Sequence, residues 1–97
     1  MGIMRSFVYP ANLSPEKKGG FTVQFRDLPE AITSGKNRAD ALLQAADCLE
    51  EAVAGRISDG LDLPAPSRAE KKEVQVALPA RMAAKATLYL ATGGFLG

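Results

Sequence analysis

The chain contains no histidine and no tryptophan, and Cys48 is the one cysteine among its 97 residues. Without histidine it lacks the commonest general base near neutral pH, which is also the commonest protein metal ligand. A single cysteine excludes an internal disulfide framework and suits a reducing compartment. The net charge is only +1, so the composition indicates no strongly basic nucleic-acid-binding surface. These absences favour a domain without catalytic, metal or cofactor sites.

Long apolar runs are also lacking. No stretch is long enough for a membrane span, and the N-terminal sequence MGIMRSFVYP has no apolar core of a secretion signal. We therefore expect a cytoplasmic protein without membrane association. Its length suits one domain, which can bury roughly 60–70% of its unfolded surface in one modest core.

Alternating and β-branched residues predict four strands. Ile3 to Tyr9 is rich in aromatic and branched residues, and we expect it to stop at Pro10. Phe21 to Arg26 alternates apolar and polar residues, and Ala31 to Lys36 carries β-branched residues before a glycine. Residues 73–78, EVQVAL, alternate again. The chain should therefore form three strands early and one late.

The segment between the third and fourth strands predicts a long helix. Asn37 is a candidate N-cap, the helix should run to about Ser58, and Gly60 should end it. Apolar residues at steps of three and four define one stripe: Ala39, Leu42, Leu43, Ala46, Leu49, Val53 and Ile57. Val53 lies near the centre of this stripe, so we expect it in the core.

A second helix is predicted to begin with Pro79 at its first position and to stop at Gly93. One side carries the apolar residues Met82, Ala83, Ala86, Tyr89 and Leu90. Leu88 instead shares the side of Arg81 and Lys85, so it is a candidate oligomer-interface residue. A dimer or tetramer is expected.

The predicted order of elements is that of an α+β fold. A polar turn, residues 11–18, joins the first two strands, which should pair as antiparallel neighbours. An antiparallel three-stranded meander, the long helix and the fourth strand give the spatial order 3-2-1-4, followed by the C-terminal helix. The right-handed crossover rule predicts a fourth strand parallel to the third. Residues 1–78 would form the α/β unit and residues 79–97 the C-terminal helix and tail. Either that helix or a second subunit must cover the open face of the sheet, and we favour a second subunit for at least part of it.

An ordered set of short motifs resembles the HicB-like antitoxins of bacterial type II toxin–antitoxin pairs. The motifs are Tyr9-Pro10-Ala11, Gly19-Gly20-Phe21, Phe25-Arg26-Asp27-Leu28-Pro29, Thr33-Ser34-Gly35, Pro64-Ala65-Pro66 and Val76-Ala77-Leu78-Pro79. The resemblance covers roughly residues 4–90 and implies a truncated ribonuclease H-like layout. It also implies a partner, a small basic HicA-like toxin that cleaves messenger RNA. Arg26 departs from the family, which more often has proline there.

Many family members continue after the second helix into a DNA-binding module. This chain has only Gly93-Gly94-Phe95-Leu96-Gly97 in that place. We therefore expect that this chain does not bind operator DNA with sequence specificity.

The ribonuclease H-like outline raises the alternative of a metal-dependent nuclease. Such a centre needs converging carboxylates, one of them from the first strand, and that strand contains no acid. Asp27 lies at a strand end, where a role in the following turn is the simpler interpretation, and Asp47 lies on the polar side of the helix. Cys48 lacks a histidine partner and is best explained as a small packing residue. A nuclease is the weakest of the functional hypotheses.

Asp40, Gln44, Asp47 and Glu51 recur at three- and four-residue steps opposite the apolar stripe. The simpler explanation is a solvated helix face, and the sharper hypothesis is a surface that meets a basic partner. Two lysine pairs, residues 17–18 and 71–72, are interpreted as isolated solubilising charge. The preferred function is a non-catalytic antitoxin that neutralises a ribonuclease toxin. The alternative is a stand-alone oligomeric scaffold protein without a toxin.

Overall fold

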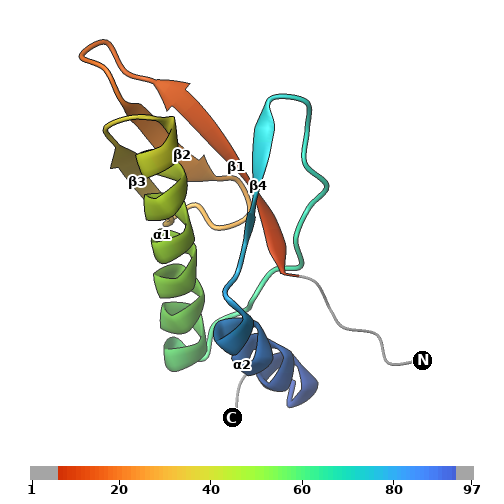
Figure 1. Ribbon diagram of the computed structural model, residues 1–97. Helices are drawn as coiled ribbons and strands as arrows, with labels where there is room; N and C mark the ends of the chain where they lie inside the picture. The colour runs from red at the N-terminus through yellow and green to blue at the C-terminus, as the bar shows by residue number, and fades with distance from the viewer. Residues whose placement is uncertain (1–6, 94–97) are drawn as a thin grey trace.

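The computed structural model describes residues 7–93. A four-stranded sheet carries a long helix across one face and a shorter helix at one end (Figure 1). The elements are β1 (Val8–Pro15), β2 (Phe21–Phe25), β3 (Ile32–Gly35), α1 (Arg38–Asp59), β4 (Glu73–Ala77) and α2 (Ala80–Ala91). The strand order is β3-β2-β1-β4, so the predicted α+β fold and spatial order are confirmed. Neither described helix is long and apolar enough to cross a membrane.

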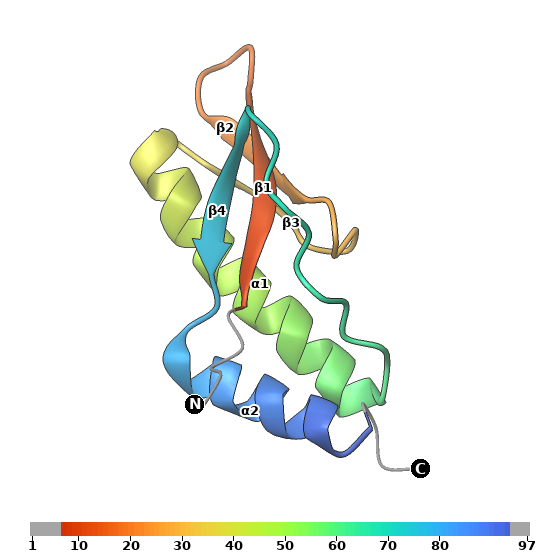
Figure 2. The ribbon, with the colours of Figure 1, turned by 90° about the vertical axis from the view of Figure 1, so that its right-hand side faces the viewer.

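The predicted direction of the fourth strand is wrong. β4 pairs antiparallel with β1, and Asn12 faces Glu73 while Val8 faces Ala77. All three neighbouring strand pairs are antiparallel, so β4 also runs opposite to β3. The reason is the connection, residues 61–72, which returns along the sheet as an extended segment (Figure 2). Because the chain has returned to the other end of the sheet before β4 begins (Figure 2), β4 runs antiparallel to β3 instead of parallel to it.

The predicted bounds of the first strand are also wrong. Residues 3–6 lie outside the described part of the chain, and the strand continues through Pro10 to Pro15. The Leu78 N–H donates to the Phe7 carbonyl over 2.9 Å. Every second residue of a strand bonds to the same neighbouring strand, so the backbone groups of Phe7 and Tyr9 point to β4. Pro10 therefore faces the β2 side, just beyond the last residue of β2, and its missing N–H removes no ladder bond.

The turn between the first two strands is correspondingly shorter than the predicted residues 11–18. Ala11 to Pro15 pairs with β2 instead of forming a loop. The hairpin closes at Glu16, whose N–H donates to the Gly20 carbonyl and whose carbonyl accepts from Gly19, both over 3.0 Å. Gly19 and Gly20 both have positive φ, a conformation that favours glycine.

The core lies between the sheet and α1. Its largest fully buried side chains include Tyr9 from β1, Phe25 from β2, and Leu49 and Val53 from α1. Val53 was predicted to be a core residue, and this prediction is confirmed. Within α2, the buried residues Met82, Ala86 and Tyr89 confirm the predicted apolar side, although Pro79 is the N-cap and Ala80 the first helical residue.

The apolar stripe of α1 is rotated from its predicted position. The buried residues recur at steps of four, at Ala41, Ala45, Leu49 and Val53. Leu43, predicted to be in the stripe, is 69% exposed. The rotation follows from close packing at the start of α1, because a Cβ atom added to Gly35 would lie 2.3 Å from the Ala41 backbone nitrogen. Small alanines, rather than leucines, therefore face the sheet there.

The face of the sheet away from α1 carries mainly polar side chains. By strand alternation these include Asn12, Thr22, Gln24, Ser34 and Gln75. An antiparallel sheet can leave such a face in water. The expected need for a second subunit to cover it is therefore not supported by its composition.

Candidate partner-binding surfaces

The first candidate surface is the acidic stripe of α1, the residues Asp40, Gln44, Asp47 and Glu51. The last three are exposed, and Asp40 is partly exposed. They lie opposite Leu49, which is fully buried against the sheet. The predicted polar face therefore exists, while its contact with a partner stays a prediction.

Asp40 differs from the rest of the stripe because it helps to begin the helix. Its carboxylate accepts a hydrogen bond from the Lys36 N–H over 2.8 Å, and its own N–H donates to Asn37 Oδ1 over 2.8 Å. The Lys36 N–H is the main cause that lowers the pKa of Asp40, and a hydrogen bond from Gln44 adds to it. Asn37 is the predicted N-cap and accepts the Asp40 N–H, while the Asp40 carboxylate reaches back one residue further, to Lys36. Charge reversal at Asp40 would therefore disturb folding as well as binding.

Leu43 is an apolar residue beside the acidic stripe that sequence analysis assigned to the core. It is 69% exposed and precedes Gln44 on the same solvent side of α1. Partner interfaces often combine an apolar anchor with surrounding polar groups. In the sequence, the one sign of this exposure was the position of Leu43 at the edge of the predicted apolar stripe.

The second candidate surface lies where α2 meets the end of α1. A groove of about 450 Å³ is lined by Ile57, Ser58, Gly60, Lys85, Leu88, Tyr89 and Thr92. Leu88 is 67% exposed at this groove. The Tyr89 hydroxyl donates to the Leu61 carbonyl over 2.7 Å, and Arg81 pairs with Glu50 over 3.2 Å. These contacts hold α2 against α1, so the groove has defined walls.

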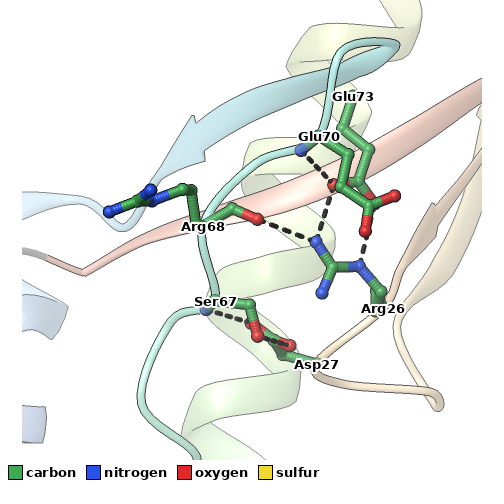
Figure 3. A network of polar contacts seen from close by, with 6 residues as sticks. All are labelled: Arg26, Asp27, Ser67, Arg68, Glu70 and Glu73. Atoms are coloured by element: carbon green, nitrogen blue, oxygen red, sulfur yellow. Dashed lines mark hydrogen bonds and ion pairs between the residues drawn. The ribbon is translucent and has the colours of Figure 1, made fainter.

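A polar cluster joins the end of β2 to the connection before β4 (Figure 3). Arg26 donates to both carboxylate oxygens of Glu73, over 3.0 and 2.8 Å, and to the Arg68 carbonyl over 3.0 Å. Asp27 accepts from the Ser67 N–H and hydroxyl, each over 2.7 Å. We call Arg26, Asp27, Ser67 and Glu73 the β2–β4 clasp. The clasp gives Arg26 a structural role.

The clasp perturbs the acidity of Glu73. The hydrogen bond from Arg26 is the main cause that lowers the pKa of this carboxyl from 4.5 to about 2, and the Glu70 N–H contributes further. The carboxylate is therefore ionised at every physiological pH. Sequence analysis missed the clasp because its partners are far apart along the chain.

The carboxylates considered for a nuclease centre do not meet. Asp27 is engaged by Ser67, and Asp47 lies on the exposed face of α1. Among residues 7–93, no three histidine, cysteine, aspartate or glutamate side chains are grouped so as to hold a metal ion. Cys48 is partly buried, and burial, followed by the charge of Glu51, raises the pKa of its thiol. This disfavours the thiolate that a nucleophile requires.

The two lysine pairs, interpreted as isolated, lie at the same end of the sheet. Lys17 and Lys18 are in the turn that joins β1 to β2, and Lys71 and Lys72 precede Glu73, which faces Asn12 near the end of β1. All four lysines are exposed. The acidic stripe and this basic end are therefore separate surfaces.

Comparison with known proteins identifies relatives over most of the described chain. Residues 8–87 match the family described as "HicB_like antitoxin of bacterial toxin-antitoxin system". Antitoxin HicB 1 of Photorhabdus laumondii is 37% identical over 76 residues, which are 78% of this chain and 49% of the relative. Antitoxin HicB of Escherichia coli K12 is 35% identical over 80 residues, 82% of this chain and 58% of the relative. The chain thus spans about half the length of the curated relatives that it matches.

Proposed function

This chain belongs to the HicB-like antitoxin family, and from that premise we propose that it binds and neutralises a small basic toxin that cleaves messenger RNA. The observation that carries the proposal is the exposed acidic face of α1. In this proposal the chain acts in the cytoplasm as a binding protein and not as a nuclease.

Two charges of the acidic stripe are available to a partner. Asp47 and Glu51 are exposed, and neither takes part in an ion pair within the described residues. Glu50, next to them in sequence, is already paired with Arg81. Asp47 and Glu51 can therefore attract a basic protein without first breaking an internal contact.

The expected mechanism is competition for the positive surface of the toxin. A ribonuclease must attract the phosphates of its substrate, and a carboxylate-bearing helix can occupy the same surface. Complementary charge mainly raises the association rate, while buried apolar contacts slow dissociation. In this arrangement Leu43 supplies the apolar contact beside Asp47 and Glu51.

The proposal is tested by co-expressing this chain with a small basic HicA-like toxin, if the neighbouring gene encodes one. The two proteins should co-purify, and this chain should inhibit RNA cleavage by the toxin. The double variant Asp47→Lys, Glu51→Lys should lower the association rate and its dependence on salt. The control variant Asp59→Lys, Glu70→Lys makes the same charge change at exposed residues elsewhere.

The two variants separate the possible outcomes. Equal association rates for both would remove the acidic stripe from the mechanism. Failure of the folded, unaltered chain to bind the folded toxin would contradict the antitoxin role itself. That result would favour the alternative, a stand-alone oligomeric scaffold protein. The observation in favour of the alternative is the exposed Leu88 beside an apolar groove.

We further propose that the chain forms a homodimer or tetramer and does not bind operator DNA with sequence specificity. The net charge of +1 provides little general attraction to phosphates. Light scattering tests the first proposal. A gel shift on the promoter of its own gene, in the presence of nonspecific competitor DNA, tests the second.

A further inference from the structure

The patch around Leu88 combines a protruding apolar side chain with an apolar groove. Leu88 is 67% exposed, and Ile57 and Tyr89 line the groove beside it. A surface that carries both a projection and a matching hollow is suited to a copy of itself. In a two-fold interface each copy contributes the same patch, so every contact is made twice.

Charges of opposite sign occur at the same patch. Lys85 lines the groove and forms no ion pair with any residue in the described range. Asp62 follows the end of α1 and is exposed. It directly follows Leu61, whose carbonyl accepts the hydrogen bond from the Tyr89 hydroxyl at the groove over 2.7 Å. Lys85 and Asp62 thus provide complementary charge that a two-fold arrangement can pair across the interface.

The other exposed surfaces suit a second copy less well. The acidic stripe carries Asp47 and Glu51, which repel the same charges on an identical chain. The sheet face away from α1 is polar, and Ile32 is its one strongly exposed large apolar residue within the described strands. The patch around Leu88 is therefore the best place for self-association.

We propose that a second copy of this chain docks on this patch through a two-fold axis, with Leu88 of each copy in the groove of the other and Lys85 paired with Asp62 across the interface. This inference rests on the proposed self-association and names its surface. The acidic stripe of α1 stays exposed in such a dimer, so each copy can still bind a basic partner. The expected complex then contains two chains and two toxins.

The apolar part of the interface is tested with two matched variants. Leu88→Gln and Leu43→Gln each replace an exposed helical leucine with an uncharged residue of high helix propensity. Analytical ultracentrifugation of the full chain should show dimer dissociation increased roughly 100-fold by Leu88→Gln, since burial of each leucine contributes about tenfold and two are lost. Leu43→Gln should leave the dimer unchanged.

The charged part of the interface permits a mixing experiment. Lys85→Asp and Asp62→Lys should each weaken the homodimer, because each places like charges opposite one another. An equimolar mixture of the two variants should dimerise again, since both cross-interface pairs are then restored in the mixed dimer. A mixture that stays monomeric would contradict the pairing of Lys85 with Asp62.

The outcomes distinguish the surface from the self-association on which it rests. If the unaltered chain dimerises and both leucine variants dimerise equally well, the proposed surface is wrong while self-association stands. A monomer at every concentration would contradict both proposals. If Leu88→Gln abolishes toxin binding but leaves the dimer intact, the groove belongs to the toxin and this inference is overturned.

Discussion

Replacement of Gly35 by alanine tests the packing that sets the position of α1. The Cβ atom of an alanine at this position would lie 2.3 Å from the Ala41 backbone nitrogen and 2.5 Å from its Cα atom. The obstructing atoms belong to a helix backbone, so no side-chain rotation can relieve the overlap. The φ angle of Gly35 is not positive, and the cost is therefore steric rather than torsional.

The expected loss of stability is at the upper end for overpacking, about 3 kcal/mol. Gly55 provides a matched control, because it lies within α1 and a Cβ atom added there meets nothing within 4 Å. Gly55→Ala should stabilise the helix by about 0.5–1 kcal/mol through its higher helix propensity. The same chemical change should thus have opposite effects at the two glycines.

Thermal unfolding followed by circular dichroism measures both variants. For a domain of this size, about 1 kcal/mol shifts Tm by roughly 4–8 °C. Gly35→Ala should therefore lower Tm by roughly 12–24 °C, while Gly55→Ala should raise it by roughly 2–8 °C. Equal Tm values for the two variants would refute the close approach of β3 to α1.

Three further predictions concern the core, the β2–β4 clasp and the cysteine. Val53→Asp places a charge in the core and should lower the free energy of unfolding by several kcal/mol. Glu51→Ala, on the exposed face, should change it by less than about 0.5 kcal/mol. Thermal melts that coincide for the two variants would show that the orientation of the helix is wrong. Because the folded-state pKa of Glu73 is lowered to about 2 from 4.5, its contribution to stability is complete above pH 4.5 and is lost as the pH falls toward 2. Urea titrations should show a smaller acid-induced loss of stability in Arg26→Ala, and an unchanged loss would exclude the clasp as its cause. Cys48 should react with iodoacetamide more slowly in the native chain than in urea at pH 7, since burial raises the pKa of its thiol; equal rates would contradict its partial burial.

The elements with strong local signals were predictable from sequence. α1 begins after Asn37, whose side chain accepts the Asp40 N–H, and ends at Gly60 with φ of 69°. β2 and β3 lie within one residue of their predicted bounds because turn residues flank them. In each case the information lies within a few residues of the boundary.

The features that depend on distant residues were not predictable. Pro10 stops a strand only if its N–H position faces a neighbouring strand, and that depends on where β2 ends. The direction of β4 depends on the path of the connection, residues 61–72. Within the candidate sites, exposure of Leu43 depends on the approach of α1 to Gly35. These outcomes are set by packing across the sheet, which local patterns do not encode.

The central place of β1 has a consequence for the order in which the chain is synthesised and folds. β1 can pair with β2 as soon as the hairpin has formed, but its other edge waits for β4, which is made late. Until then that edge exposes the Tyr9 and Ala11 backbone groups, which another strand could occupy. In the folded chain the β1–β4 ladder joins two segments that are far apart in the sequence, and β4 is an edge strand of the sheet. We therefore expect the amides of Val74 and Val76 to exchange with solvent sooner than that of Gln24, which bonds to β1 in the hairpin, as measured by hydrogen exchange. The latest part of the fold to assemble is then also the earliest to open.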